Sequence, residues 1–504
     1  ERIIPMSIKR PNHEQLATII KNLGMSMDAN EVNFFLENLQ GVFDRYDLID
    51  SMPDNITPVL YPRTSGYRPT KEENPHNAWY WKSEITGASE GKLSNKTIAI
   101  KDNVMVAGVP MMNGASTLEG FVPEVDATVV KNVLDAGGVI KGKASCEYFC
   151  TSGGSHTNAK GPVHNPIKRG YSSGGSSSGC GSLIASGDVD LAVGTDHGGS
   201  CRIPASFCGI VGMKATYGLV SCDGIMPIEA TVDYVGPMSK TVEDCALLLE
   251  VLVREDQDSG SIPRAFKGDG YLSQLKNGCD NLKIGVLKEG FNCENSEPEV
   301  DKVVLEAADQ FKKMGAIVES ISIPNHRFAT AIWTPIYLEG LVCSSMQGNG
   351  YGKNAEGYFS PSLIQAHKDW RSLTDRFGPQ TELIMLVGEY ITQKYNSYFY
   401  AKSQNLRRLL RRDYEIKFKD YDLILMPTLP MVATKLPKKD AKASEIVSKS
   451  LEMAINTPAA DLTGHPSISI PCGYSNGLPV GLMLTGRFFE EGKLLAAAYA
   501  FENK

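Results

Sequence analysis

The sequence lacks long apolar runs: none reaches the roughly 18 residues that mark a candidate membrane-spanning helix. Its first thirty residues also lack the successive basic, apolar and small-residue segments of a secretory signal. Both absences argue against a membrane protein or a secreted one. We therefore expect a cytoplasmic protein with no membrane contact.

An excess of basic residues is also absent. The 51 lysines and arginines face 58 aspartates and glutamates, which gives a formal net charge of −7 across 504 residues. Nucleic-acid-binding domains usually carry a basic stripe, so we expect no nucleic-acid partner. The one local basic cluster is typical of a solvated helix face, with Leu409 and Leu410 turned inward. That cluster comprises Arg407, Arg408, Arg411 and Arg412.

Metal-ligand patterns are missing as well. The chain has only eight histidines, and no two of its eleven cysteines show Cys-x-x-Cys spacing. Cys146 and Cys150 are four apart, but no second pair follows them. Zinc sites normally need two such pairs. The sequence therefore predicts reduced thiols and neither a metal nor another cofactor.

What the sequence does contain is a pair of loops rich in glycine and serine. GGSSSG at 174–179 and DHGGSCR at 196–202 flank the short apolar run LAV. Glycine allows tight turns and brings backbone N–H groups close to a ligand, so such loops favour a nucleophile beside an anion-binding nest. Lys101 in TIAIKDNV is placed to supply a base. These residues suggest a Ser-Ser-Lys hydrolase without a catalytic histidine.

The rest of the chain alternates between strand and helix patterns. TIAIK and VIKGKA, separated by an amphipathic helix, indicate a βαβ unit. We expect an α/β protein whose central twisted mixed β-sheet is covered by helices on both faces. Further strands are expected at 190–196, 211–221, 281–287, 317–324, 421–427, 466–473 and 478–486, with helices at 241–253, 297–315 and 490–503.

The two flanks of this pattern differ from it. Residues 13–50 have helical periodicity and predict two helices, whereas 51–90 look like a surface-crossing segment anchored by Trp79, Tyr80 and Trp81. We therefore expect residues 1–70 to form an N-terminal helical segment packed on the core. Residues 71–504 are expected to form a single α/β domain, with a helical, aromatic-rich insert at about 325–420 over the substrate pocket.

Several ordered motifs resemble the amidase signature family, most closely its bacterial enantioselective amidase branch. They are IAIKDN, GPVHNP, SSGGSSSG, GTDHGGSCRIPASFCGIVGMKATYGLV, GPMSKTVED, TGHPSISIPCG and GLPVGLMLTGR. The match runs from about 70 to 260 and from about 420 to 504. The resemblance implies a mixed sheet of about eleven strands covered by helices.

The resemblance also implies roles for single residues. The nucleophile falls on Ser200, the bridging serine in a cis peptide on Ser176, and the base on Lys101. The oxyanion donors are the amides of His197, Gly198, Gly199 and Ser200, and the supporting residues are Ser177, Asp196 and Arg202. Tyr148, Gly175 and Ile228 are expected to bind substrate, with Trp333 and Tyr337 as further pocket walls.

Lys101 can act as a base only when its amine is neutral. Free lysine titrates near pH 10.4, so we expect burial and hydroxyl partners to depress its pKa. Asp102 is expected to point elsewhere, because successive side chains of a strand face opposite ways.

Two positions depart from the family pattern, His197 and Cys201, and each allows another interpretation. His197 is either the base of a Ser-His-Asp arrangement or a residue that contributes only its amide, and we favour the second. Cys201 is either a thiol nucleophile or a small packing residue. We again favour the second, because its side chain should point away from the Ser200 hydroxyl.

The function expected from this resemblance is an amidohydrolase that cleaves small carboxamides, with carbamates, anilides and esters as related substrates, through a Ser acyl-enzyme. One alternative is a glutaminase-type component of an amidotransferase, and another is a non-catalytic binding protein on the same fold. The expected partner is a small amide or carbamate, and a homodimer is left open.

Overall fold

A computed structural model of the chain describes residues 8–253, 270–351 and 357–504, which separate into two compact units, Glu1–Pro58 and Val59–Lys504. The first unit contains three helices, α1 (His13–Asn22), α2 (Ala29–Asn38) and α3 (Gln40–Ser51), where two were predicted. Asn12 and Asp28 each cap a helix through their side chains. Leu39 alone separates α2 from α3, and the apolar periodicity of the sequence runs through it.

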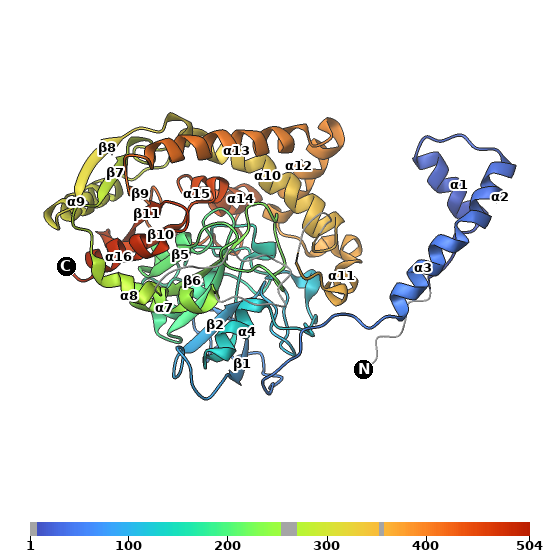
Figure 1. Cartoon of the computed structure of the whole chain (residues 1–504), viewed down its shortest axis with the longest axis horizontal. Helices are drawn as coiled ribbons and strands as arrows, with labels where there is room; N and C mark the ends of the chain where they lie inside the picture. Colours follow the sequence, from blue (N-terminus) through green and yellow to red (C-terminus); the bar gives the residue numbers. More distant parts are fainter. Residues whose placement is uncertain (1–7, 254–269, 352–356) are drawn as a thin grey trace. The chain divides into compact units, whose positions relative to one another are not determined.

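The second unit is built on one sheet of eleven strands (Figure 1). The sequence motifs expected to be strands all lie in it. The strands are β1 (Trp79–Thr86), β2 (Thr97–Lys101), β3 (Val139–Ala144), β4 (Leu191–Asp196), β5 (Val211–Lys214), β6 (Tyr234–Ser239), β7 (Lys283–Leu287), β8 (Ile317–Ile321), β9 (Leu423–Pro427), β10 (Ser467–Ser475) and β11 (Leu478–Gly486).

The strand order is β1-β3-β2-β4-β6-β5-β10-β11-β9-β7-β8. β2 pairs in parallel with β3 and β4, and β7 pairs in parallel with β8 and β9. The remaining pairs are antiparallel. The sheet is therefore mixed, as the sequence predicted, and the β2–α4–β3 unit confirms the expected βαβ pattern.

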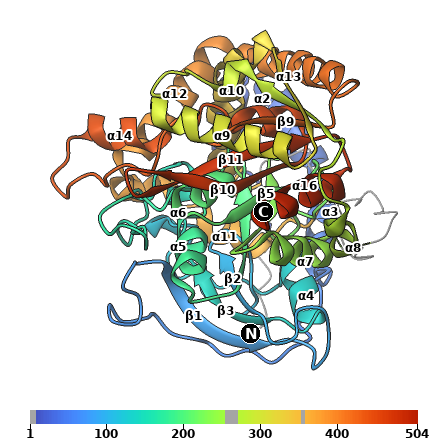
Figure 2. The same cartoon turned by 90° about the vertical axis from the view of Figure 1, so that its left-hand side faces the viewer.

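Helices cover both faces of this sheet (Figures 1 and 2). In the main core cluster, Ile98 and Ile100 of β2 pack with residues of α4 and α7, whereas Ala99 packs with residues of α5 and α6. Successive strand residues face opposite ways, so these two helix pairs lie on opposite faces. Lys101 lies two residues after Ala99 on the same strand, so its side chain faces the same side of the sheet and projects toward α5 and α6.

The helices of this unit have the following bounds. They are α4 (Thr128–Asp135), α5 (Ser178–Ser186), α6 (Arg202–Cys208), α7 (Val242–Leu252), α8 (Tyr271–Gln274), α9 (Pro298–Lys313), α10 (Ala329–Leu341), α11 (Pro361–His367), α12 (Pro379–Tyr395), α13 (Tyr398–Lys417), α14 (Ala443–Leu451), α15 (Pro458–Thr463) and α16 (Glu491–Glu502). In the described part of the chain, no helix combines the length and apolarity needed to cross a membrane.

Two sequence predictions about local structure were wrong. The aromatic residues from Trp79 belong to the edge strand β1, which pairs with β3, and not to a crossing segment. Arg407 and Arg411 are not a simple solvated face: they donate to the carbonyls of Thr231 and Thr463. Leu409, expected to face inward, is 39 % exposed, whereas Leu410 is buried as expected and Arg408 and Arg412 are exposed.

Candidate active site

Lys101 ends β2 and is fully buried beneath the α5 side of the sheet. Its Nζ donates to Ser176 Oγ at 2.8 Å and to Thr195 Oγ1 at 2.8 Å. Ser176 follows a cis Gly175–Ser176 peptide bond, just before α5 begins. The structure therefore brings Lys101 and Ser176, 75 residues apart in sequence, into direct contact.

Asp102 points away from Lys101, as expected from strand alternation. Its Oδ2 accepts from the amides of Met112 and Gly114, each at 3.2 Å, and its Oδ1 lies 4.0 Å from Lys143 Nζ. Burial raises the pKa of Asp102 to about 7 despite Lys143. The carboxylate next to Lys101 in sequence therefore interacts with a different amine.

The pKa of Lys101 does not follow the sequence prediction. Burial disfavours the ammonium form of Lys101 and so lowers its pKa. The surrounding thiols act in the other direction: when ionised, they stabilise the ammonium and raise the pKa, and Cys150 has the largest effect among them. Their balance raises the pKa of Lys101 above its ordinary value. The sequence analysis considered burial and hydroxyl partners, and it left out the cysteines that the fold gathers here.

Ser200 lies in the tight loop between β4 and α6, where Gly199 adopts φ +128°. All four carbonyl oxygens of residues 197–200 accept hydrogen bonds, so the loop is held from its carbonyl side. The bonds are Trp333 Nε1 to His197 O at 3.0 Å, Thr457 Oγ1 to Gly198 O at 2.6 Å, Ile203 N to Gly199 O at 2.6 Å and Ser177 N to Ser200 O at 3.3 Å.

The N–H groups of the same loop are used unequally. Gly199 N, expected among the oxyanion donors, donates instead to Asp196 Oδ1 at 2.6 Å. The amides of His197, Gly198 and Ser200 have no acceptor within the residues that the structure describes. Three donors of this loop are therefore free to bind an incoming oxygen atom.

A buried charge cluster supports the loop. Arg202 donates to Asp196 Oδ1 at 3.0 Å and to Asp461 Oδ2 at 2.8 Å, and all three side chains are inaccessible to solvent. Burial opposes the charge on Asp196, but Arg202 outweighs it and lowers that pKa. Burial raises the pKa of Asp461 to about 8 despite Arg202. Ser177, also expected in support, donates to Thr195 O at 3.1 Å.

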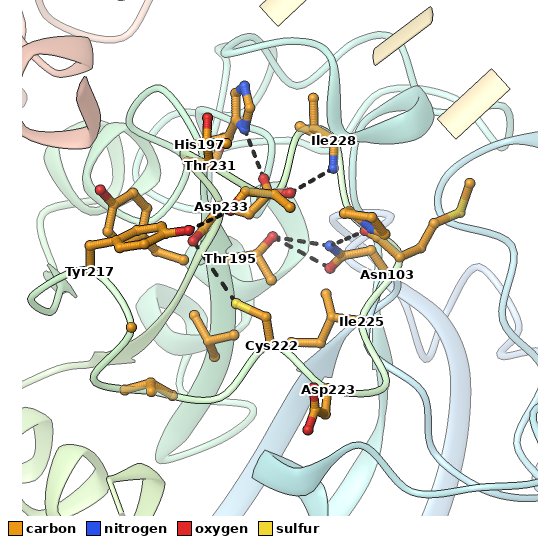
Figure 3. A pocket seen from close by; sticks show the side chains of 18 of the residues that line it. Asn103, Thr195, His197, Tyr217, Cys222, Asp223, Ile225, Ile228, Thr231 and Asp233 are labelled. Atoms are coloured by element: carbon orange, nitrogen blue, oxygen red, sulfur yellow. Dashed lines mark hydrogen bonds and ion pairs between the residues drawn. The ribbon is translucent and has the colours of Figure 1, made fainter. Parts of the chain in front are cut away.

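Ser176 and Ser200 both line a cavity of about 460 Å³. Figure 3 shows other residues of its lining, among them Asn103, Thr195 and Ile228. Within the described residues, no hydrogen bond joins the two hydroxyls. The walls are largely aromatic and aliphatic, and they include Ile228, as expected. Other lining residues are Asn103, Thr195, His197, Tyr217, Asp223, Ile225, Thr231, Asp233, Tyr234, Tyr351, Tyr358 and Phe359.

The other residues expected to bind substrate lie elsewhere. Trp333 and Tyr337 line a much smaller neighbouring cavity together with Ser200. Tyr148 and Gly175 line neither of these two cavities. Tyr148 is buried with its ring against Phe149 and Phe377, and Gly175 packs against the backbone of Gly154 so closely that a Cβ would overlap it. The structure thus gives Tyr148 and Gly175 packing contacts at this site.

His197 and Cys201 differ in their surroundings. His197 Nδ1 lies 2.8 Å from Asp233 Oδ1, and no hydrogen bond in the described part of the chain joins His197 to Ser200. Cys201 is fully buried against Gly236 O, and burial raises the pKa of its thiol well above the ordinary value. Its thiol is therefore neutral near pH 7 and faces away from the cavity, which it does not line.

Sequence reasoning missed several residues of this site. Thr195 and Asn103 stand in the motifs GTD and IKDN, so their positions could have been found; Asn103 Nδ2 donates to Thr195 Oγ1 at 3.2 Å. Cys150, Asp233 and Asp461 lie outside the loops that drew attention. Within the described ranges, no group of three or more histidine, cysteine or acidic side chains is arranged to hold a metal ion.

Comparison with known proteins agrees with this arrangement. A family model described as Amidase matches residues 61–495. The enantioselective amidase of Rhodococcus rhodochrous is 38% identical over 502 residues, which cover 99% of this chain and 96% of that protein.

Two solved structures are also similar. A glutamyl-tRNA(Gln) amidotransferase component from Thermotoga maritima superposes with a TM-score of 0.71 at 31% identity, covering 86% of this chain and 88% of that one. The native peptide amidase of Stenotrophomonas maltophilia superposes with a TM-score of 0.67 at 25% identity, covering 82% and 83%.

The similarity therefore extends over the sheet, its helices and both serine loops. The family model alone covers most of the chain, and the Rhodococcus relative aligns along nearly all of it. The chain belongs to the amidase signature family, and it is an amide-hydrolysing enzyme.

Proposed function

We propose that the enzyme cleaves the C–N bond of small carboxamides through an acyl-enzyme on Ser200, with Ser176 and Lys101 as the proton relay. The observation that carries this proposal is the Lys101 Nζ–Ser176 Oγ hydrogen bond of 2.8 Å, behind a cavity that both serines line. A serine hydroxyl needs a base to become a nucleophile, and Lys101 is the only amine that contacts either serine in the described residues.

In the first step, Ser200 Oγ attacks the carbonyl carbon and passes its proton to Ser176 Oγ. The Ser176 proton moves to neutral Lys101, which becomes an ammonium. The oxyanion accepts from the free amides of the 197–200 loop, where each such donor typically contributes about 3 kcal/mol. Hydrogen bonds of catalytic groups often tighten only when substrate is bound, so the missing Ser176–Ser200 bond is compatible with this relay.

In the second step, the ammonium of Lys101 returns its proton through Ser176 to the leaving nitrogen, and the C–N bond breaks. Water then attacks the acyl ester, with the same residues accepting and returning a proton. The products are the carboxylic acid, ammonia or an amine, and the free enzyme. Carbamates, anilides and esters can react through the same steps of acyl-enzyme formation and hydrolysis.

A second candidate is a glutaminase-type component, because the Thermotoga structure is part of an amidotransferase. The cavity argues against free glutamine as substrate. Its lining includes the carboxylates of Asp223 and Asp233 but no lysine or arginine among the described residues. An α-carboxylate bound there would lack the bidentate cation that such groups prefer. A non-catalytic role is opposed by the preserved contact between Lys101 and Ser176.

Ser200→Ala tests the proposal. Turnover of acetamide, propionamide or benzamide by the purified chain, followed as ammonia release, should fall by roughly a thousandfold or more. A fluorophosphonate should label the wild-type peptide that carries Ser200 and should not label this variant. Ser448→Ala, on exposed α14, is the matched control and should keep wild-type activity.

Near-normal kcat in a folded Ser200→Ala variant would refute the assignment of the nucleophile. Activity only on glutamine, and only when a second protein is present, would favour the amidotransferase alternative.

A further inference from the structure

His197 and Asp233 form a buried pair that joins two separate loops of the site. His197 opens the loop that carries Ser200, and its Nδ1 lies 2.8 Å from Asp233 Oδ1 (Figure 3). The two side chains are 4% and 17% exposed. Asp233 ends the segment whose residues Pro227, Ile228 and Thr231 line the large cavity.

The second oxygen of Asp233 holds that segment in shape. Oδ2 accepts from Ile228 N at 2.9 Å and from Glu229 N at 3.0 Å. One carboxylate therefore closes the turn 228–233 on itself and also ties it to His197. Figure 3 shows Asp233 between His197 and the backbone of Ile228.

The opposite side of the same turn is attached to α13. Tyr400 Oη donates to Glu229 Oε1 at 2.8 Å, and Arg407 Nη1 donates to Thr231 O at 2.9 Å. The cavity wall at 227–231 is therefore held from outside by α13. The His197–Asp233 pair is the side-chain link between this wall and the loop that carries Ser200.

We propose that His197 and Asp233 are a positioning pair that fixes the cavity wall at 227–231 relative to Ser200 and thereby sets which acyl groups the enzyme accepts. This inference rests on the proposed acyl-enzyme mechanism. The imidazole does not contact Ser200 in this structure, so its action runs through the wall. Ser345 Oγ also donates to Pro227 O at 2.6 Å and Tyr217 Oη to Ala230 O at 2.9 Å. Loss of the pair removes the one side-chain bond that the described residues form between this wall and the nucleophile loop, and so blurs the distinction between large and small acyl groups.

The charge of His197 makes this selectivity depend on pH. Burial opposes an imidazolium, but the carboxylates of Asp233, Glu229 and Asp461 outweigh it and raise the pKa of His197. The other faces of the ring meet the uncharged rings of Trp333 and Tyr337. The ion pair is therefore complete below this raised pKa and is lost as the pH rises through it. Acyl selectivity should weaken over the same pH range.

The test is the ratio of kcat/KM for benzamide to that for propionamide. In His197→Ala and in Asp233→Asn, the ratio should fall about fivefold or more, chiefly through KM. His197→Asn should restore the ratio only in part, because the asparagine Nδ2 can occupy the place of the imidazole Nδ1 and donate to Asp233 but carries no charge. That variant should also lose the pH dependence of the ratio. His76→Asn, on a separate loop, is the control.

A folded His197→Ala or Asp233→Asn variant whose ratio stays within about twofold of wild type would overturn the inference. If one variant fails to fold, the other decides. Labelling rates of Ser200 with a methyl and a benzyl fluorophosphonate give a second ratio that needs no turnover. Failure of the proposed function is distinct, because then the wild-type protein neither hydrolyses these amides nor labels at Ser200.

Discussion

Lys101 lies among buried thiols, and one of them governs its proton affinity. Burial raises the pKa of Cys146 and Cys201 well above their ordinary value and that of Cys180 to about 12, so these thiols are neutral near pH 7. Burial also opposes ionisation of Cys150, whose thiol donates to Asn113 Oδ1 at 3.2 Å, but Cys146 and Lys101 outweigh burial and lower its pKa below the ordinary value. Cys150 is therefore the thiol that stabilises the Lys101 ammonium.

This arrangement predicts the effect of Cys150→Ser on the pH profile. In the proposed mechanism the active base is neutral Lys101, so kcat/KM should rise with pH and level off above the pKa of Lys101. Removing the thiolate destabilises the ammonium and lowers that pKa. The rising limb should move to lower pH by roughly one unit.

The measurement is kcat/KM for propionamide as a function of pH, with Cys472→Ser, in the distant strand β10, as the control. A limb that stays in place in folded Cys150→Ser would contradict the assigned influence of the thiol. A limb near the ordinary histidine pKa of about 6.5 that His197→Ala removes would instead make histidine the base.

At the scale of elements, the loop between β4 and α6 is oriented through its carbonyls. Because the carbonyl oxygens of His197 and Gly199 accept from Trp333 Nε1 and Ile203 N, the N–H groups of Gly198 and Ser200, which belong to the same two peptides, face the other way. Trp333 of α10 thus orients the free N–H of Gly198, one of the proposed oxyanion donors, whereas Thr457, which precedes α15, holds the next peptide of the loop from its carbonyl side.

Thr457→Val tests this carbonyl-side support. The substitution keeps the shape of the side chain but removes the donor to Gly198 O, and an unpaired buried carbonyl costs about 1–3 kcal/mol. The loop should relax by turning this peptide, and kcat should fall roughly tenfold with little change in KM. Thr457→Ser keeps the hydroxyl and should retain most activity. Equal kcat in the valine and serine variants would contradict the argument.

The buried cluster below α6 predicts a change in stability. Arg202→Met removes the cation that pairs with Asp196, and breaking a buried pair in this way typically costs about 3–5 kcal/mol. The free energy of unfolding, measured by urea denaturation, should decrease by that order. Arg408→Met, on an exposed position of α13, should change it by less than about 0.5 kcal/mol. Similar stability of the two variants would argue against the cluster as a stabilising element.

At the scale of the whole molecule, the sheet assembles the site from distant segments. Lys101 ends β2, Thr195 belongs to β4 and Ser200 precedes α6, while Thr457 and Asp461 come from near the C-terminus. All the residues described at the site belong to the unit Val59–Lys504.

This single-unit origin predicts that activity does not depend on association. The specific activity of the purified chain should be the same from nanomolar to micromolar concentration, because each chain carries its own cavity and relay. The check is initial rate per chain across this dilution series, with the oligomeric state followed by light scattering. Loss of activity on dilution, parallel to dissociation, would show that a second copy completes the site.

Much of this molecule could be predicted from local sequence pattern. Short β-branched and apolar runs predicted β2, β3 and β4, and Gly-Ser spacing drew attention to Ser176 and Ser200, because residue type and turn chemistry depend on near neighbours. β1 was not predicted, because its aromatic residues form a strand by pairing with β3, a segment that lies more than 50 residues away in the sequence. The direction of the pKa shift at Lys101 was missed for the same reason, because Cys150 lies far from it in sequence.

The sequence by itself determined the βαβ order and the turns that carry both serines, and it supplied the candidates for the reacting groups, because these depend on residue type and short-range spacing. The tertiary structure alone decided which amides of the 197–200 loop remain free and which charge reaches Lys101. It also decided that His197 pairs with Asp233, 36 residues away. Hydrogen bonds and charges act over a few ångströms in space, and only the folded sheet brings these partners within that distance.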